Sequence, residues 1–143
     1  MSRGAGLAKI SKASRAAKRK KAFSIILVDN DFYFRQAIRR LLLENGLSVI
    51  AFERPSDVLL SRLPLKDVVL LLDIWMPEMT GVALWKELHQ RGFTIPTILI
   101  TGQRDERSTR FGEEIGAVAV LFKPVEEKQL LDTIARALAC ANN

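Results

Sequence analysis

The sequence has one cysteine, one histidine and no long hydrophobic run, and each of these scarcities excludes a class of protein. Cys140 has no partner for a disulfide within the chain, and His89 alone offers little for a transition-metal site. No apolar run approaches the ~18 residues that a membrane-spanning helix needs. The first residues also lack the apolar core of a signal peptide. With 143 residues, the chain fits a single domain in a reducing cytoplasm.

Acidic residues are absent from the start of the chain. Eight of the 22 Lys and Arg residues precede Phe23, whereas the first acid is Asp29. The remaining 14 basic and 16 acidic residues give the rest of the chain a net charge of −2. The net charge of +6 therefore belongs to a basic tail, residues 1–21, ahead of a domain at 22–143. We expect the tail to be disordered, because it has too few large apolar side chains to offset its ordering entropy.

The tail ends in a contiguous basic run, Lys18 to Lys21. Such a run suits an anionic partner, which would be nucleic acid, a membrane surface or an acidic protein. It equally suits a solubilising extension, and its composition is similar to that of organelle transit peptides. No aromatic residue lies among these basic groups, which argues against base stacking. The sequence does not decide between an anionic partner, a solubilising extension and a transit peptide.

From Phe23 onwards, short apolar runs alternate with amphipathic stretches. The runs predict five strands, at 24–28, 47–52, 68–72, 95–100 and 117–122. Five helices are expected between and after them: one that ends at Gly46, a short one from Pro55, one capped by Thr80 that ends before Gly92, and two at 109–114 and 126–139. Strands that are apolar almost throughout are buried on both faces. The sequence therefore predicts an α/β fold, a doubly wound (βα)5 domain with a five-stranded parallel sheet.

Polar side chains gather where four of these strands end. They are Asp29 and Asn30, Asp73, Thr101 and Lys123. The carboxyl ends of parallel strands meet at one edge of a sheet, and ligands bind there, where the strand order reverses. We expect Asp31 to cap the first helix instead of joining this site.

Five short motifs carry a family resemblance. They are Val28-Asp29-Asn30, the segment from Leu72 to Pro77, Thr80-Gly81, Ile100-Thr101-Gly102 and Phe122-Lys123-Pro124. Together, in this order and each at a strand end, they resemble the receiver domain of two-component response regulators, which has a flavodoxin-like fold. The resemblance spans residues 23–139, and family members have a cis peptide bond after the lysine.

The resemblance implies a role for each polar residue at the sheet edge. Asp73 would accept a phosphoryl group from a histidine kinase, a phosphotransfer protein or a small phosphodonor. Attack by a carboxylate on an anionic phosphoryl group needs a cation, and Mg²⁺ suits oxygen ligands. Asp29, Asn30, Asp73 and the backbone carbonyl of Trp75 would hold the ion. Lys123 would pair with Asp73 at rest and with the phosphoryl oxygens afterwards.

The resemblance also implies a switch. Thr101 would move to hydrogen-bond the phosphoryl group, and an output partner would read the change on the face formed by the fourth helix, fifth strand and fifth helix. The chain would be a monomer or a phosphorylation-dependent dimer. It would not be an enzyme, apart from its own phosphorylation and dephosphorylation. The chain stops at Asn143 after the last predicted helix, which suits a single-domain regulator or part of a longer protein.

Four positions depart from the family pattern or vary within it. Asn30 replaces the second acid of the metal pair, so we expect weaker Mg²⁺ binding than in typical receivers. Val120 stands where many receivers have an aromatic switch residue, which predicts an altered output. Trp75 and Gln103 occupy the two positions that govern access of water to the phosphoryl group. A bulky Trp75 predicts a long-lived phosphoryl state.

The sequence also bears on three rival functions. A phosphatase with an aspartate nucleophile would carry a second acid two residues after Asp73, where this chain has Trp75. A nucleotide-binding protein would show a glycine-rich loop after a strand, and none is present. A degenerate receiver that binds a partner without phosphorylation remains open, because Asn30 and Val120 both favour it.

Overall fold

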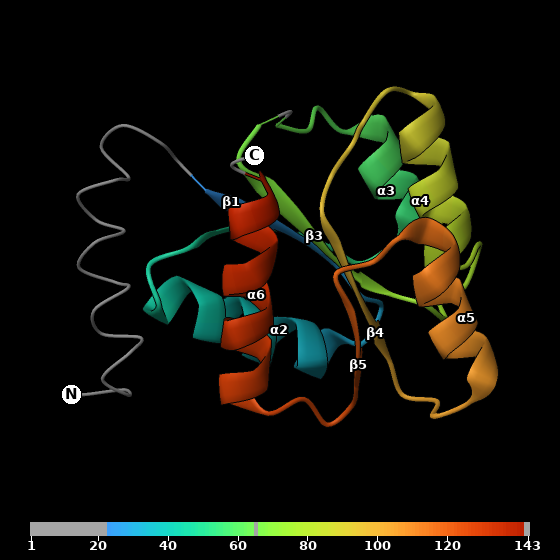
Figure 1. Ribbon diagram of the computed structural model, residues 1–143. Helices are drawn as coiled ribbons and strands as arrows, with labels where there is room; N and C mark the ends of the chain where they lie inside the picture. Colours follow the sequence, from blue (N-terminus) through green and yellow to red (C-terminus); the bar gives the residue numbers. More distant parts are fainter. Residues whose placement is uncertain (1–22, 65, 142–143) are drawn as a thin grey trace.

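The computed structural model describes residues 23–64 and 66–141, so the predicted basic tail at 1–21 lies outside the described residues. The described residues form five strands and five helices in strict alternation (Figure 1). The strands are β1 (Ser24–Val28), β2 (Ser48–Phe52), β3 (Val68–Asp73), β4 (Thr97–Thr101) and β5 (Ala119–Phe122). The helices are α2 (Phe32–Glu44), α3 (Pro55–Leu60), α4 (Gly81–Gln90), α5 (Glu106–Ile115) and α6 (Glu127–Ala141).

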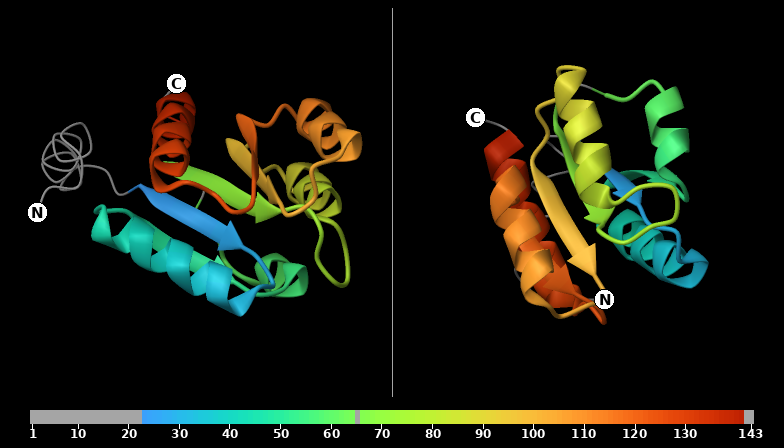
Figure 2. Two further views of the ribbon diagram at one scale, coloured as in Figure 1. Left: turned by 90° about the horizontal axis from the view of Figure 1, so that it is seen from below. Right: turned by 90° about the vertical axis from the view of Figure 1, so that its right-hand side faces the viewer.

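The five strands pair in parallel in the order β2-β1-β3-β4-β5, which confirms the predicted doubly wound (βα)5 sheet (Figure 2). The register brings the carboxyl ends of the strands to one edge. Val28 is aligned with Leu72, and Thr101 is aligned with Phe122. The residues that follow these positions therefore lie at the same edge of the sheet.

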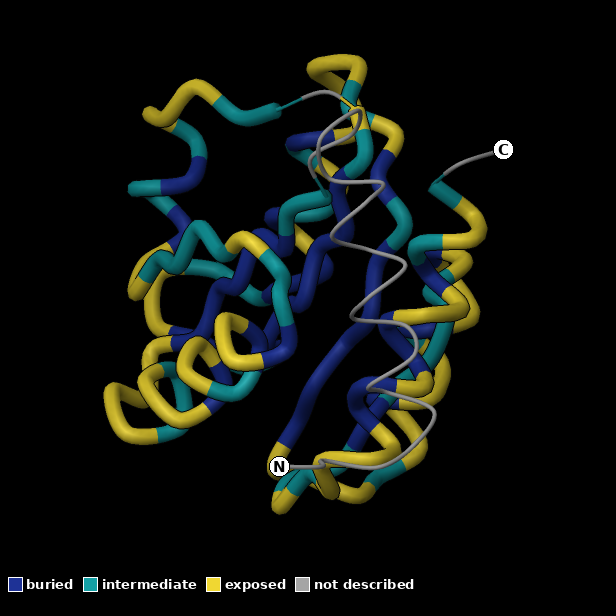
Figure 3. The backbone as a smooth tube through the Cα atoms, turned by 90° about the vertical axis from the view of Figure 1, so that its left-hand side faces the viewer, coloured by how far each residue is buried: buried dark blue, intermediate teal, exposed yellow. Residues whose placement is uncertain are grey.

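Alternate residues of each central strand point to opposite faces of the sheet. In β3, Val69 and Leu71 pack with α2 and α6, whereas Val68, Leu70 and Leu72 pack with α3, α4 and α5. Figure 1 shows α2 and α6 together on one side of the sheet and the other three helices on the other side. Every residue of β3 is buried, as the dark central strands in Figure 3 show. This confirms the prediction, from the uninterrupted apolar runs, of a sheet covered on both faces.

Two predicted helix caps are confirmed. The Asp31 carboxylate accepts hydrogen bonds from the backbone N–H groups of Tyr33 and Phe34, at 3.0 and 3.2 Å. The Thr80 hydroxyl accepts one from the Ala83 N–H at 3.1 Å. Both side chains thereby satisfy N–H groups that a helix start leaves without partners.

Helix α5 begins three residues earlier than the predicted start at Thr109. Its N-cap is Asp105, whose carboxylate accepts a hydrogen bond from the Ser108 N–H at 3.0 Å. Strands β4 and β5 each begin two residues later than predicted. Pro96 has no N–H for the β4 ladder, although its carbonyl accepts a hydrogen bond from the Leu70 N–H at 2.9 Å. Among the described helices, none combines the length and hydrophobicity required to cross a membrane.

Candidate functional site

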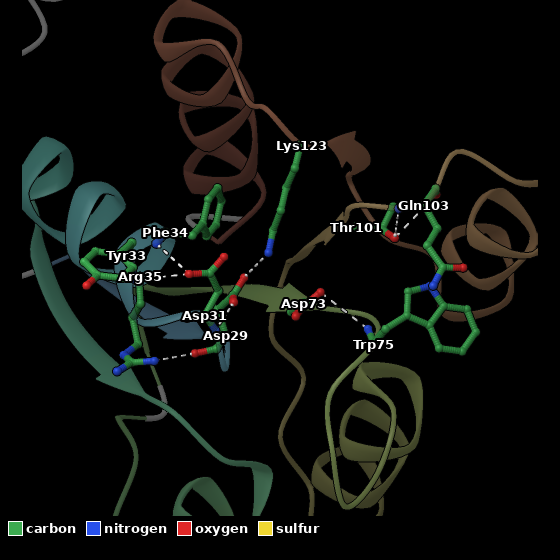
Figure 4. A network of polar contacts seen from close by, with 10 residues as sticks. All are labelled: Asp29, Asp31, Tyr33, Phe34, Arg35, Asp73, Trp75, Thr101, Gln103 and Lys123. Carbon is green, nitrogen blue, oxygen red and sulfur yellow. Dashed lines mark hydrogen bonds and ion pairs between the residues drawn. The ribbon is translucent and has the colours of Figure 1, made fainter.

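Four of the predicted site residues converge at the carboxyl edge of the sheet (Figure 4). Asp29 directly follows β1, Asp73 ends β3, Thr101 ends β4 and Lys123 directly follows β5. Strands β1 and β3 are neighbours, but the helices that follow them cover opposite faces of the sheet. The two aspartates therefore lie at the point where the strand order reverses, which is where open α/β sheets bind their ligands.

The two aspartates are buried, and the positive charge near Asp73 does not offset the cost of burying its carboxylate. Their exposed fractions are 1% for Asp29 and 5% for Asp73. Burial and, to a smaller degree, the negative charge of Asp29 raise the pKa of Asp73 to about 7. The ammonium of Lys123 and the N–H groups of Trp75 and Ile74 lower this pKa, but they do not offset the increase. A cation bound beside Asp73 would favour the ionised form of its carboxylate.

Lys123 reaches the site from the end of β5, but it pairs with Asp29. Its Nζ atom lies 2.9 Å from Asp29 Oδ2, and it also lies 4.2 Å from the centroid of the Phe34 ring. This corrects the predicted resting pair of Lys123 and Asp73. The physical reason is that Asp29 and Phe34 together offer the ammonium an ion pair and an aromatic face. The Lys123–Pro124 peptide bond is cis, as the resemblance implied.

The donor atoms at this edge fit a magnesium ion. Within residues 23–64 and 66–141, no cluster of three or more His, Cys, Asp or Glu side chains forms a metal centre by itself. Asp29 and Asp73 supply two carboxylates, Asn30 is exposed beside them, and the backbone carbonyl of Trp75 follows Asp73 by two residues. Mg²⁺ prefers such oxygen ligands and keeps several waters, so a site with few protein ligands suits it.

The Thr101 hydroxyl is engaged by its own loop. Thr101 is fully buried, and its Oγ1 atom accepts a hydrogen bond from the Gln103 N–H at 3.0 Å. The backbone carbonyl of Thr101 accepts a hydrogen bond from the Lys123 N–H at 2.8 Å. This bond joins the end of β4 to the residue that follows β5. A move of Thr101 towards Asp73 would therefore have to break the bond with Gln103. The predicted role of Thr101 stays a prediction.

Trp75 links Asp73 to α5. Its N–H donates to Asp73 Oδ1 at 3.4 Å, and its indole extends away from Asp73 towards α5 (Figure 4). There the indole lies 5.7 Å from the Phe111 ring and 4.7 Å from the guanidinium of Arg107, measured from ring centroids. The predicted shielding of a phosphoryl group by Trp75 stays a prediction, as does the predicted role of Gln103 in the access of water. Val120, at the predicted switch position, packs against the buried Gly112 of α5.

Sequence reasoning missed Phe34, which contacts the functional lysine. Phe34 lies on the face of α2 that carries Ile38 and packs against the core. Its spacing of four residues from Ile38, together with its place in the first turn of the helix, could have located it near the sheet edge. Arg35 was also missed; it donates to the backbone carbonyl of Asp29 at 2.8 Å.

The fold and the site define a doubly wound α/β domain with two buried carboxylates at the point where the strand order reverses. A family model described as "Response regulator receiver domain" matches residues 25–135. The chain belongs to this family.

Two curated relatives and two solved structures illustrate the similarity. Nodulation protein W of Bradyrhizobium diazoefficiens is 33% identical over 113 residues, which cover 79% of this chain and 50% of that protein. Transcriptional regulatory protein FixJ of Rhizobium meliloti is 30% identical over 115 residues, which cover 80% of this chain and 56% of that protein. The chain thus spans about half the length of these two relatives.

The solved structures agree with this assignment. The crystal structure of FixJ-N has a TM-score of 0.76 and 28% identity, and the match covers 83% of this chain and 95% of that chain. The structure of response regulator StyR has a TM-score of 0.78 and 34% identity, with 85% of this chain and 61% of that chain covered.

Proposed function

We propose that this domain is a phosphorylation-controlled switch in which Asp73 accepts a phosphoryl group from a histidine kinase or a phosphotransfer protein. One observation carries the proposal. Asp73 is a buried carboxylate at the strand switch point, beside a second buried carboxylate and within a site that also holds a lysine. Structural acids at strand ends normally cap helices or close turns, but here Asp31 and Thr80 serve as the caps.

In the proposed reaction, an oxygen of the Asp73 carboxylate forms a bond to phosphorus. The P–N bond of the phosphohistidine donor breaks, and its electron pair returns to the imidazole. Mg²⁺, when bound, would neutralise the charges that otherwise oppose this attack. Lys123 would then turn from Asp29 to the phosphoryl oxygens, and the Thr101 hydroxyl would donate to one of them. These two shifts would bias the fold towards a second state.

The proposal is tested by the intact mass of the protein after incubation with a small phosphodonor and Mg²⁺. We expect the parent chain to gain one phosphoryl group and the Asp73→Asn variant to gain none, because an amide is not a nucleophile here. Asp132→Asn removes an exposed acid of α6 and serves as the matched control, with a gain equal to that of the parent. A folded parent that gains nothing at saturating metal would instead indicate a degenerate receiver that binds its partner without phosphorylation.

Replacing Asn30 with Asp should tighten Mg²⁺ binding. The exposed amide contributes no charge, and a carboxylate near the ion adds attraction of about 1 kcal/mol per unit of ion charge even in a water-like dielectric. For the doubly charged Mg²⁺ this is about 2 kcal/mol, so we expect the Kd for Mg²⁺ to fall roughly thirtyfold. Calorimetric titration would measure it, with Gln90→Glu as a control that adds the same charge at the end of α4, far from the site. Equal affinities of parent and Asn30→Asp would contradict the charge argument.

Further parts of the proposal rest on the family assignment. The output partner would bind the face formed by α5, β5 and α6, and the domain would be a monomer or a phosphorylation-dependent dimer in the cytoplasm. Relatives such as FixJ are named as transcriptional regulatory proteins, which supports a role in transcriptional control. Val120 in this face predicts an altered output, and Trp75 predicts slow hydrolysis of the phosphoryl group. The basic tail, for which an anionic partner is one prediction, lies outside the described residues.

A further inference from the structure

Two neighbours of different chemistry hold the ammonium of Lys123. Asp29 provides the ion pair at 2.9 Å, and the ring of Phe34, from the first turn of α2, lies 4.2 Å away (Figure 4). The lysine side chain is 21% exposed, so the pair and the ring contact are partly shielded from water. A cation over an aromatic face is attracted by the negative centre of the ring, and the attraction grows as water is excluded.

Lys123 contacts the carboxylate of Asp29, which is also one of the predicted ligands of the metal ion. Asp29 Oδ1 accepts a hydrogen bond from the Asp31 N–H at 2.8 Å, and Asp29 Oδ2 faces Lys123 Nζ. A divalent ion bound to Asp29 would lie a few ångströms from this ammonium, and the two positive charges would repel each other. Metal binding and the resting position of Lys123 therefore compete.

We propose that Phe34 is a positioning residue that holds Lys123 on Asp29 in the metal-free domain, so that Mg²⁺ binds only as the lysine is released towards Asp73. This inference rests on the proposed function of the site. The ring stabilises the metal-free arrangement and not the metal-bound one. Phe34 thus lowers the affinity for Mg²⁺ and makes the arrival of the ion the event that frees the lysine for the phosphoryl group.

The first experiment is a calorimetric titration of the full chain with MgCl2. Phe34→Leu removes the aromatic face and keeps an apolar side chain, and we expect its Kd for Mg²⁺ to be about threefold lower than that of the parent. Phe34→Tyr keeps a ring and should bind like the parent. Phe32→Leu is the matched control: it removes a ring from the same turn that contacts Tyr33 and Arg35. Phe34→Met provides a second ring-free variant if the leucine variant does not fold.

Repeating the change of Phe34 in a variant without the lysine shows whether Phe34 acts by positioning Lys123 or by packing in the core. In Lys123→Gln the cation is absent, so the change of Phe34 to Leu should have no further effect on the Kd. If the change of Phe34 to Leu still lowers the Kd for Mg²⁺ in Lys123→Gln, Phe34 acts through packing and the inference is overturned. An unchanged or weaker Kd in both ring-free variants also overturns it, and leaves the proposed metal site standing. A folded parent that binds no Mg²⁺ overturns both the inference and the metal site.

Discussion

Asp73→Asn is expected to stabilise the metal-free protein by about 4 kcal/mol at pH 8 and by about 2 kcal/mol at pH 5. The cause is the pKa of Asp73, which burial and the charge of Asp29 raise from 3.8 to about 7 in the folded state. Between these two values the folded state binds more protons than the unfolded state, so the free energy of unfolding falls as the pH rises from about 4 to about 7. Asn carries no charge and avoids this loss.

Urea unfolding in the presence of a chelator, at pH 5 and pH 8, measures the effect. The control is again Asp132→Asn, whose carboxylate is exposed and whose removal should change stability little and equally at both pH values. Adding Mg²⁺ at pH 8 should stabilise the parent and narrow its difference from the Asn variant, because the ion binds the ionised carboxylate. A stabilisation by Asp73→Asn that is the same at both pH values would contradict the raised pKa.

The sequence predicted the sheet well because its strands are uninterrupted apolar runs. Residues 68–72 could only be a strand buried on both faces, and the structure buries every one of them. Helix α5 was the weakest prediction, since Phe111 and Ile115 are the only large apolar residues in it and its true start depends on the Asp105 cap. A helix with only two large apolar residues offers few positions from which its bounds could be predicted.

Topology explains why the site residues could be predicted. Residues that follow parallel strands must meet at one edge, so the convergence of Asp29, Asp73 and Lys123 followed from strand order alone. Strand order did not predict that Lys123 would pair with Asp29. A long side chain at this edge can reach either of two carboxylates, and in the structure it pairs with Asp29 while its ammonium also faces the Phe34 ring. The contact depends on the three-dimensional position of Phe34, a helix residue that the sequence analysis did not single out.

Gly81→Ala is expected to destabilise the domain by about 3 kcal/mol. In an exposed helix the same change would stabilise by up to ~1 kcal/mol, because alanine is the better helix former. Here a Cβ atom would collide with the backbone carbonyl of Asp73 and lie 3.0 Å from Leu72 Cγ. Neither neighbour can retreat easily, since Asp73 ends a buried strand and the Gly81 N–H is bonded to the Ile74 carbonyl at 2.7 Å.

The collision falls on the residue that carries the proposed chemistry, so Gly81→Ala should also displace Asp73 and weaken Mg²⁺ binding. Urea unfolding and a metal titration on the same samples would show both effects. Gly102→Ala is the matched control near the site: an added Cβ there meets nothing within 4 Å, so both quantities should stay close to those of the parent. If Gly81→Ala is as stable as Gly102→Ala, the β3–α4 loop can move away from the strand end. The close approach of Gly81 would then not be what holds Asp73 in place.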